Sequence, residues 1–184
     1  MTAAESLVLE QLFADTFFND WNTRLVGGGD EPIYLPADAA HGHHRIIYRH
    51  DYFSSALHET AHWCVAGEAR RKLVDFGYWY QPDGRTRDQQ RAFEQAEVKP
   101  QALEWLFTAA TGRTFRPSAD NLNGPDADSR GPSAAFVAAI AGQARAWCLE
   151  GGMPSRGRLF VERLAAHYGV SEPFDPDRYR SLAG

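Results

Sequence analysis

Two histidines and a glutamate in the segment His58-Glu59-Thr60-Ala61-His62 have the residue types and the spacing of a metal site. They follow the pattern H-E-x-x-H within a stretch whose apolar spacing is typical of a helix. Positions four apart lie about one helical turn apart on the same face, so both imidazoles can bind a single divalent ion. The segment therefore predicts a metal-binding helix, with an ordinary helix surface without an ion as the alternative.

The neighbours of this motif predict a helix that is mostly buried. Asp51, Ser54 or Ser55 would serve as its N-cap, and Gly67 would end it. Apolar side chains occupy most positions between these limits: Leu57, Ala61, Trp63, Cys64, Val65 and Ala66. A buried helix must satisfy the polar atoms of its two histidines and its glutamate, and coordination of an ion is one way to do so.

Two histidines do not complete a catalytic metal site. A third ligand must come from another part of the chain, while at least one coordination position stays open for water, oxygen or substrate. The segment 93–105 is the natural donor, because it carries Glu94, Glu97 and Glu104 on or beside a largely apolar helix. An acidic residue of this segment is therefore the predicted third ligand.

Glu97 is the preferred ligand among these acids. It shares a helical face with Phe93 and, if the helix is continuous, with Gln101, and the apolar neighbours on that face would point it inward. Glu94 is the second choice. On spacing alone, a surface ion pair between Glu97 and Lys99 or a nearby arginine is an equal alternative.

The elements that must position these residues predict an α+β protein. Besides the metal helix, helices are predicted at residues 5–18, 86–96, 100–110, 133–149 and 156–167, and extended strands at 31–36, 45–50 and 72–80. Pro100 would either start a new helix or kink a continuous one. Because the strands come early and the helices later, the expected architecture is a small β-sheet packed with helices.

The remaining segments are predicted as connections. Glycines 27–29 would break the chain, residues 114–132 would form a polar loop, and the tail after Gly169 would be irregular. The histidines in segment 41–44 invite a metal interpretation, but their glycine and alanine neighbours favour an exposed loop without an ion.

The composition is that of a water-soluble protein. The 184 residues are 43% apolar and 23% charged, which favours one domain over residues 1–184, and no run of about 18 apolar residues predicts a membrane span. The N-terminal segment lacks a basic region before an apolar stretch, so a cytoplasmic location is expected, with Cys64 and Cys148 as reduced thiols. The net charge of −5 argues against nonspecific binding to nucleic acid.

Several blocks of the sequence, in the same order, resemble the elongation factor P hydroxylase family. The blocks with the strongest resemblance are residues 58–67, 73–80 and 97–105, and those that fit the same pattern are 18–24, 30–38 and 120–122. The resemblance covers about residues 10–165. Departures lie in the 41–44 loop and in the C-terminal tail, where little chemistry is expected.

This resemblance implies an activity and a ligand set. Members of the family hydroxylate the modified lysine of translation elongation factor P, which would be the protein partner. The resemblance implies a post-translational monooxygenase, an oxidoreductase, on a small α+β fold with a zincin-like metal helix. It also implies His58, His62 and Glu97 as ligands of Fe(II). No site for an organic reductant or a keto-acid cosubstrate is identifiable in the sequence, so the electron source is unassigned.

A zinc-dependent hydrolase, peptidase-like or nuclease-like, is the rival hypothesis. It would use the same His-His-Glu ligands for Zn²⁺, with Glu59 as the general base on the bound water. In a hydroxylase, Glu59 would instead orient the ligands. A binding module with a structural ion is the third hypothesis, and saturation of the ion by protein atoms would favour it.

A basic substrate loop would require acidic and aromatic residues around the opening of the site. Four residues are candidates for such contacts: Asp75, Tyr78, Asp83 and Asp120. Each is explained better as a capping, turn or core residue than as a substrate contact. The sequence therefore assigns no substrate-binding residue.

Overall fold

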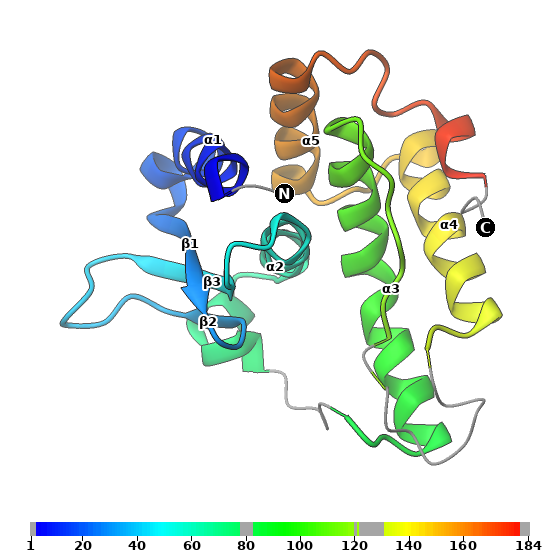
Figure 1. Cartoon of the computed structure of the whole chain (residues 1–184), viewed down its shortest axis with the longest axis horizontal. Helices are drawn as coiled ribbons and strands as arrows, with labels where there is room; N and C mark the ends of the chain where they lie inside the picture. The colour runs from blue at the N-terminus through cyan, green and yellow to red at the C-terminus, as the bar shows by residue number, and fades with distance from the viewer. Residues whose placement is uncertain (1–2, 78–82, 120, 122–130, 181–184) are drawn as a thin grey trace.

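The computed structural model describes residues 3–77, 83–119, 121 and 131–180 (Figure 1). Within these residues the chain forms five α-helices and one three-stranded sheet, which confirms the predicted α+β class. The helices are α1 (Ala3–Trp21), α2 (Phe53–Val65), α3 (Arg87–Ala110), α4 (Ala134–Glu150) and α5 (Ser155–Tyr168). The strands are β1 (Thr23–Gly29), β2 (Ile33–Leu35) and β3 (His44–Arg49).

Helix α2 is central to the arrangement. Figure 1 shows α1 and the sheet on one side of α2, and α3 and α4 on the other. A cluster of aromatic rings joins α1, α2 and α5: the ring of Trp63 lies 4.9 Å from that of Phe17, and the rings of Phe13 and Phe160 lie 5.9 Å apart. These contacts hold the helix that carries the H-E-x-x-H motif from several sides.

The ends of α2 differ from the predicted caps. The helix begins at Phe53 after the N-cap Tyr52, which makes no capping hydrogen bond through its side chain, so the prediction of Asp51, Ser54 or Ser55 is wrong. Its C-cap is Ala66, one residue before the predicted Gly67. Since Phe53 is almost fully buried, packing of this residue sets the start of the helix in place of a polar cap.

A buried arginine from α5 completes the C-terminal end of α2. The guanidinium of Arg156 donates hydrogen bonds to the carbonyl oxygens of Trp63 at 2.9 Å, Cys64 at 3.1 Å and Ala66 at 2.8 Å. The last carbonyl groups of a helix have no partner within the helix, and a positive charge there also interacts favourably with the helix dipole. Arg156 therefore ties α5 to the helix that carries the H-E-x-x-H motif.

Helix α3 is continuous through Pro100, so the two helices predicted at 86–96 and 100–110 are one element. It starts with a capping box, in which the side chain of Thr86 accepts a hydrogen bond from the Gln89 amide and the Gln89 side chain accepts one from the Thr86 amide. The continuous helix brings Glu97, Gln101 and Glu104 to one face, as the ligand prediction required.

Strand β1 was not predicted, because glycines 27–29 were interpreted as a chain break. The sheet order is β1-β3-β2, with β1 parallel and β2 antiparallel to β3. A Cβ on Gly27 would lie 2.7 Å from the Tyr48 hydroxyl oxygen, and one on Gly29 would lie 2.8 Å from Cγ2 of Ile47. These glycines allow close approach between strands, which the sequence pattern does not distinguish from a loop.

The strand predicted at 72–80 is wrong over its described part. The chain forms short 3₁₀ turns at η1 (Arg70–Lys72) and η2 (Val74–Gly77), while residues 78–80 lie outside the described residues. Asp75 and Phe76 have φ of 47° and 57°, in the left-handed region. Tertiary contacts outweigh the strand propensity, because the Phe76 ring stacks on that of Tyr34 at 4.3 Å and its carbonyl accepts a hydrogen bond from Arg70.

The other elements follow their predictions within a few residues. Helices α1, α4 and α5 and strands β2 and β3 lie where they were expected. The C-terminal tail is largely irregular, but it contains a 3₁₀ turn, η4 (Pro176–Tyr179), whose Tyr179 ring is fully buried. Cys64 and Cys148 are both free thiols. No helix among the described residues is both long and apolar enough to span a bilayer.

Candidate metal centre

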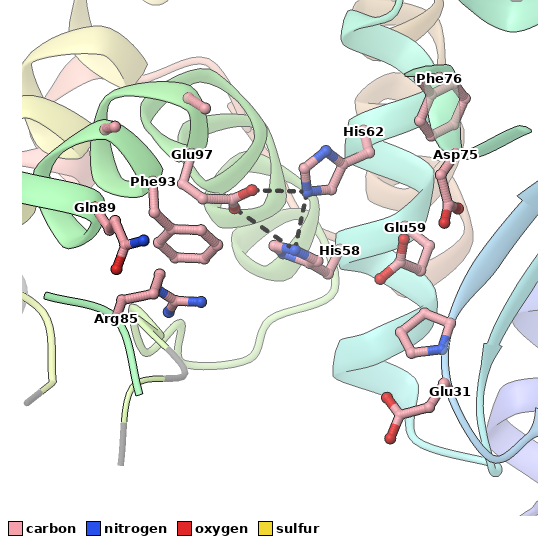
Figure 2. A pocket seen from close by; sticks show the side chains of 13 residues that line it. Glu31, His58, Glu59, His62, Asp75, Phe76, Arg85, Gln89, Phe93 and Glu97 are labelled. Carbon is pink, nitrogen blue, oxygen red and sulfur yellow. Dashed lines mark hydrogen bonds and ion pairs between the residues drawn. The ribbon is translucent and has the colours of Figure 1, made fainter. Parts of the chain in front are cut away.

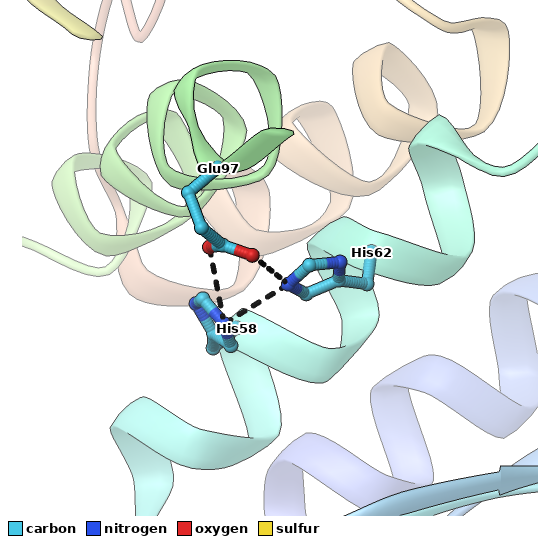
Figure 3. Close-up of side chains that lie close together, drawn as sticks. All are labelled: His58, His62 and Glu97. Atoms are coloured by element: carbon cyan, nitrogen blue, oxygen red, sulfur yellow. Dashed lines mark hydrogen bonds and ion pairs between the residues drawn. The ribbon is translucent and has the colours of Figure 1, made fainter. Parts of the chain in front are cut away.

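Three side chains from two helices meet between α2 and α3 (Figure 3). The Nε2 atom of His62 lies 3.0 Å from Nε2 of His58 and 3.1 Å from Oε1 of Glu97. The distance between Nε2 of His58 and Oε2 of Glu97 is 3.6 Å. The structure thus brings together the three residues that the sequence proposed as ligands, although their binding of an ion stays a prediction.

The spacing of these three donor groups fits one shared ion. An ion with bonds of about 2.1 Å to nitrogen and oxygen holds adjacent donors about 3.0–3.4 Å apart in octahedral or tetrahedral geometry. The two imidazole nitrogens lie 3.0 Å apart, and each lies 3.1 or 3.6 Å from a different oxygen of the Glu97 carboxylate, so these separations are close to that range. Two imidazole nitrogens and a carboxylate also form a donor set suited to Fe(II) or Zn²⁺.

Two residues further along α3 hold the candidate ligands in place. Nδ1 of His58 lies 2.8 Å from Oε2 of Glu104, so the Nδ1–H donates to the carboxylate and Nε2 is the ring nitrogen directed toward Glu97 and His62. Gln101 donates from Nε2 to Oε2 of Glu97 at 3.3 Å and to the carbonyl of Ser118 at 2.6 Å. The sequence placed Gln101 and Glu104 on this face but assigned neither residue an orienting role.

The alternatives weighed for the third ligand do not match the structure. The carboxylate of Glu94 accepts hydrogen bonds from the amide and the hydroxyl of Ser133, at 2.9 and 2.7 Å, and is not part of the three-ligand group. Glu97 is 5% exposed and forms its ion pairs with the two histidines. A surface ion pair between Glu97 and Lys99 is therefore wrong.

The charges in the group are strongly coupled. Burial of His58 disfavours its charged form and so lowers its pKa. Together, the carboxylates of Glu104, Glu97 and Glu59 have a larger effect in the opposite direction and raise the pKa of this histidine to about 10. Burial likewise opposes ionisation of Glu97, but the two histidines and the hydrogen bond from His62 lower the pKa of Glu97 to about 2. The acidic surroundings that hold a proton on His58 also favour a divalent cation at that position.

The histidines of segment 41–44 do not form a second metal group. His41 Nδ1 pairs with Asp38 at 3.2 Å, and His44 Nδ1 accepts a hydrogen bond from the Ala37 amide at 2.9 Å. The ring of His43 lies near Phe18. Among the residues that the structure describes, the only set of three possible ligands in contact is His58, His62 and Glu97.

A cavity of about 490 Å³ opens beside the three ligands (Figure 2). Its lining comes from the loop before β2, from α2, η2 and α3, and from the segment before α3: Glu31, Pro32, His58, Glu59, His62, Asp75, Phe76, Arg85, Gln89, Ala92, Phe93, Ala96 and Glu97. Glu59 thus faces the same space as the ligands, and burial raises the pKa of its carboxyl. An ion at the three ligands would be open to a bound molecule.

The four residues predicted as candidate substrate contacts differ in their position relative to the cavity. Asp75 lines the cavity and Asp83 does not, whereas Tyr78 and Asp120 lie outside the described residues. Sequence reasoning missed Glu31, Arg85 and Phe93 as lining residues. No local pattern marks them, because they reach the cavity from three separate segments that only the tertiary structure brings together.

Replacing Glu104 by glutamine should weaken metal binding by about tenfold, because the amide still accepts the hydrogen bond from His58 but no longer carries the charge that favours a cation. Calorimetric titration of the purified protein with Fe(II) or Zn²⁺ measures this change. The exposed Glu162, which pairs with Arg158, is the matched control, and Glu162→Gln should bind metal like the unaltered protein. Equal affinities for both variants would contradict the orienting role of Glu104.

Comparison with known proteins gives a consistent result. The family model described as elongation factor P hydroxylase matches residues 12–179. The chain is also similar to a protein from Haemophilus influenzae named elongation factor P lysine hydroxylase, with 48% identity over 161 residues that cover 88% of each chain. The matched region contains all three candidate ligands and the residues that line the cavity.

Proposed function

Because this chain belongs to the elongation factor P hydroxylase family, we propose that it is an enzyme that hydroxylates a lysine of elongation factor P. The observation that carries the proposal is the 48% identity, over nearly the whole chain, to a protein with that activity in its name. His58, His62 and Glu97 lie together at the edge of a cavity, and this group would be the site of the reaction.

The residues of this site fit a metal-dependent monooxygenase. His58, His62 and Glu97 would hold Fe(II) in a two-histidine, one-carboxylate arrangement, which leaves positions open on the ion. Bound Fe(II) would supply the activation of oxygen beside a C–H bond of the substrate. The hydroxylation puts one oxygen atom of O₂ into that bond and reduces the other to water, so two electrons and two protons come from an external reductant.

The protein side chains would prepare this site before the substrate arrives. Glu104 would hold the Nδ1–H of His58, so that Nε2 is the nitrogen that gives up its proton to bind the ion, while Gln101 holds the carboxylate of Glu97 in place. Helix α2 would act as a zincin-type metal helix, with the third ligand supplied by α3. The cavity beside the ligands, lined partly by Phe76 and Phe93, would admit the lysine side chain and limit access of bulk water.

The zinc hydrolase is the less favoured hypothesis. It shares the three ligands and differs in the role of Glu59, which would activate a bound water as a general base. Glu59 lines the cavity, so its position is compatible with either role. The family and the name of the relative favour hydroxylation, in which Glu59 would position groups around the ion. A purely structural ion is also less favoured, since the described residues contribute three donors beside an open cavity.

The proposed activity predicts the addition of a single oxygen atom to elongation factor P. The protein would be loaded with Fe(II) without air, mixed with elongation factor P that carries its modified lysine, and then exposed to air with ascorbate as the electron donor. Mass analysis of the substrate should show one added oxygen on the peptide that contains this lysine. A fully iron-loaded protein that leaves the substrate mass unchanged under these conditions would count against the hydroxylase assignment.

A further inference from the structure

The cavity beside the metal group has two chemically different walls. Figure 2 shows Arg85, Gln89 and Phe93 together on the side of Glu97, while Glu59 and Asp75 lie beyond the two histidines with Glu31 below them. The wall contributed by α3 is mainly apolar, with alanines 92 and 96 beside Phe93. The opposite wall combines three carboxylates with the apolar surfaces of Pro32 and Phe76. A molecule that fills this space meets the metal group between the two walls.

The carboxylates of the acidic wall have few partners inside the protein. In the described part of the chain, the side chains of Glu31 and Glu59 form no hydrogen bond or ion pair, and the carboxylate of Asp75 accepts one hydrogen bond, from the Tyr34 amide at 2.9 Å. Asp75 and Glu59 are half-buried, and Glu31 is exposed at the rim. Glu59 is next to the two histidines, which interact with its charge, whereas Asp75 and Glu31 have no such contact within the described residues, so they are suited to a cation from outside.

Asp75 is held firmly toward the cavity. Its backbone and that of Phe76 are both left-handed, the Phe76 ring stacks on Tyr34, and the bond from the Tyr34 amide engages only Oδ1 of Asp75. Among the described residues none donates a hydrogen bond to Oδ2, and the side chain lines the cavity. A pre-positioned carboxylate binds a cation with less loss of conformational entropy than a mobile surface acid.

The arginine of the cavity does not neutralise the acidic wall. The guanidinium of Arg85 donates to Oε1 of Gln90 at 2.8 Å and to the carbonyl of Ala119, and it lies over the ring of Phe93 at 3.8 Å. These contacts hold the almost fully buried Arg85 on the α3 side of the cavity. The positive charge of Arg85 therefore lies with the mainly apolar wall, and the negative charges of the carboxylates lie with the opposite wall.

We infer that Asp75, with Glu31 at the rim, forms a subsite for the terminal ammonium group of an aliphatic amine side chain whose reacting carbon lies at the metal group. This inference rests on the proposed function, which supplies a lysine as the substrate. The methylene groups would pack against Phe76, Phe93 and Pro32, and the ammonium would donate to the free Oδ2 of Asp75. Asp75 is thus a specificity-determining residue for a cationic side chain.

Asp75→Asn tests this subsite without disturbing the fold. The amide oxygen of asparagine still accepts the bond from the Tyr34 amide, and asparagine tolerates the left-handed backbone at this position. With iron-loaded enzyme, KM for elongation factor P should rise at least about tenfold while kcat at saturating substrate and the affinity for iron stay the same. Asp75→Glu should recover part of the loss. Glu68→Gln, an exposed acid paired with Lys72, is the matched control and should leave KM unchanged.

A small probe separates this inference from the proposed function. Titration of the labelled protein with 1,5-diaminopentane, followed by NMR chemical shifts, should show tighter binding than titration with the neutral 1,5-pentanediol, and Asp75→Asn should remove the difference. A wild-type protein that hydroxylates its substrate, together with an Asp75→Asn variant of unchanged KM, would overturn the subsite alone. Absence of hydroxylation by the wild type would overturn the proposed function, and the diamine titration would then decide the subsite by itself.

Discussion

Replacement of Glu97 by glutamine should reduce metal affinity by more than about 100-fold, beyond the loss caused by residues that only orient the ligands. The carboxylate lies 3.1 Å from the Nε2 atom of His62 and supplies the only anionic donor of the three-ligand group. An amide in its place is a weak neutral donor, so two imidazoles would remain. Elemental analysis after dialysis and calorimetric titration both measure the loss, and hydroxylation should fall with it.

The control for this variant lies one helical turn away on α3. Glu94 is also buried, but its carboxylate binds Ser133, and a glutamine there still offers an acceptor to the serine hydroxyl. Glu94→Gln should therefore bind metal normally. If Glu97→Gln and Glu94→Gln retained the same amount of metal, Glu97 would not be a ligand, and the third donor would have to lie elsewhere.

Replacement of Arg156 by methionine should lower the free energy of unfolding by about 2 kcal/mol or more, because the buried carbonyl groups of Trp63 and Cys64 lose their donor at about 1–3 kcal/mol each, while that of Ala66 keeps its hydrogen bond from Arg71. Methionine keeps an apolar stem of similar length but offers neither the hydrogen bonds nor the guanidinium group that lies over the Trp63 ring at 4.5 Å. The C-terminal end of α2 would loosen, and with it the position of His62. Urea unfolding followed by circular dichroism measures the change.

Arg158 provides the matched comparison on the same helix. It is largely exposed, pairs with Glu162 at 3.2 Å, and its replacement by methionine should cost less than about 1 kcal/mol. A similar loss of stability in Arg156→Met and Arg158→Met would show that the contacts at the end of α2 contribute little, and that the aromatic cluster alone fixes this helix.

Local periodicity determined the parts of the site that lie within one helix. The interval between His58 and His62 is a property of any α-helix, so the pairing of the two imidazoles could be predicted without knowledge of the fold. The preference for Glu97 required a continuous α3. The sequence left that point open at Pro100, and the structure resolves it in favour of one helix.

Tertiary contacts decided the features that the sequence pattern misassigned. Residues 72–77 have the composition of a strand, yet stacking of Phe76 on Tyr34 and the hydrogen bond to Asp75 hold them in 3₁₀ turns. The run of glycines at residues 27–29 is typical of a break in regular structure. These glycines nevertheless belong to β1, where β3 approaches too closely for larger side chains. In both cases the deciding neighbour lies well away in sequence.

The sequence by itself therefore predicted the H-E-x-x-H motif, its helix, Glu97 as the preferred third residue of the candidate site, and the family resemblance. Only the tertiary structure decided that Glu104 and Gln101 contact His58 and Glu97, that Arg156 completes α2, and that Asp75 lines the same cavity as these candidate ligands. The physical reason is the range of the interactions. Helical periodicity acts between residues a few positions apart, whereas the orientation of ligands and the lining of a cavity depend on side chains that meet only when the whole chain has packed.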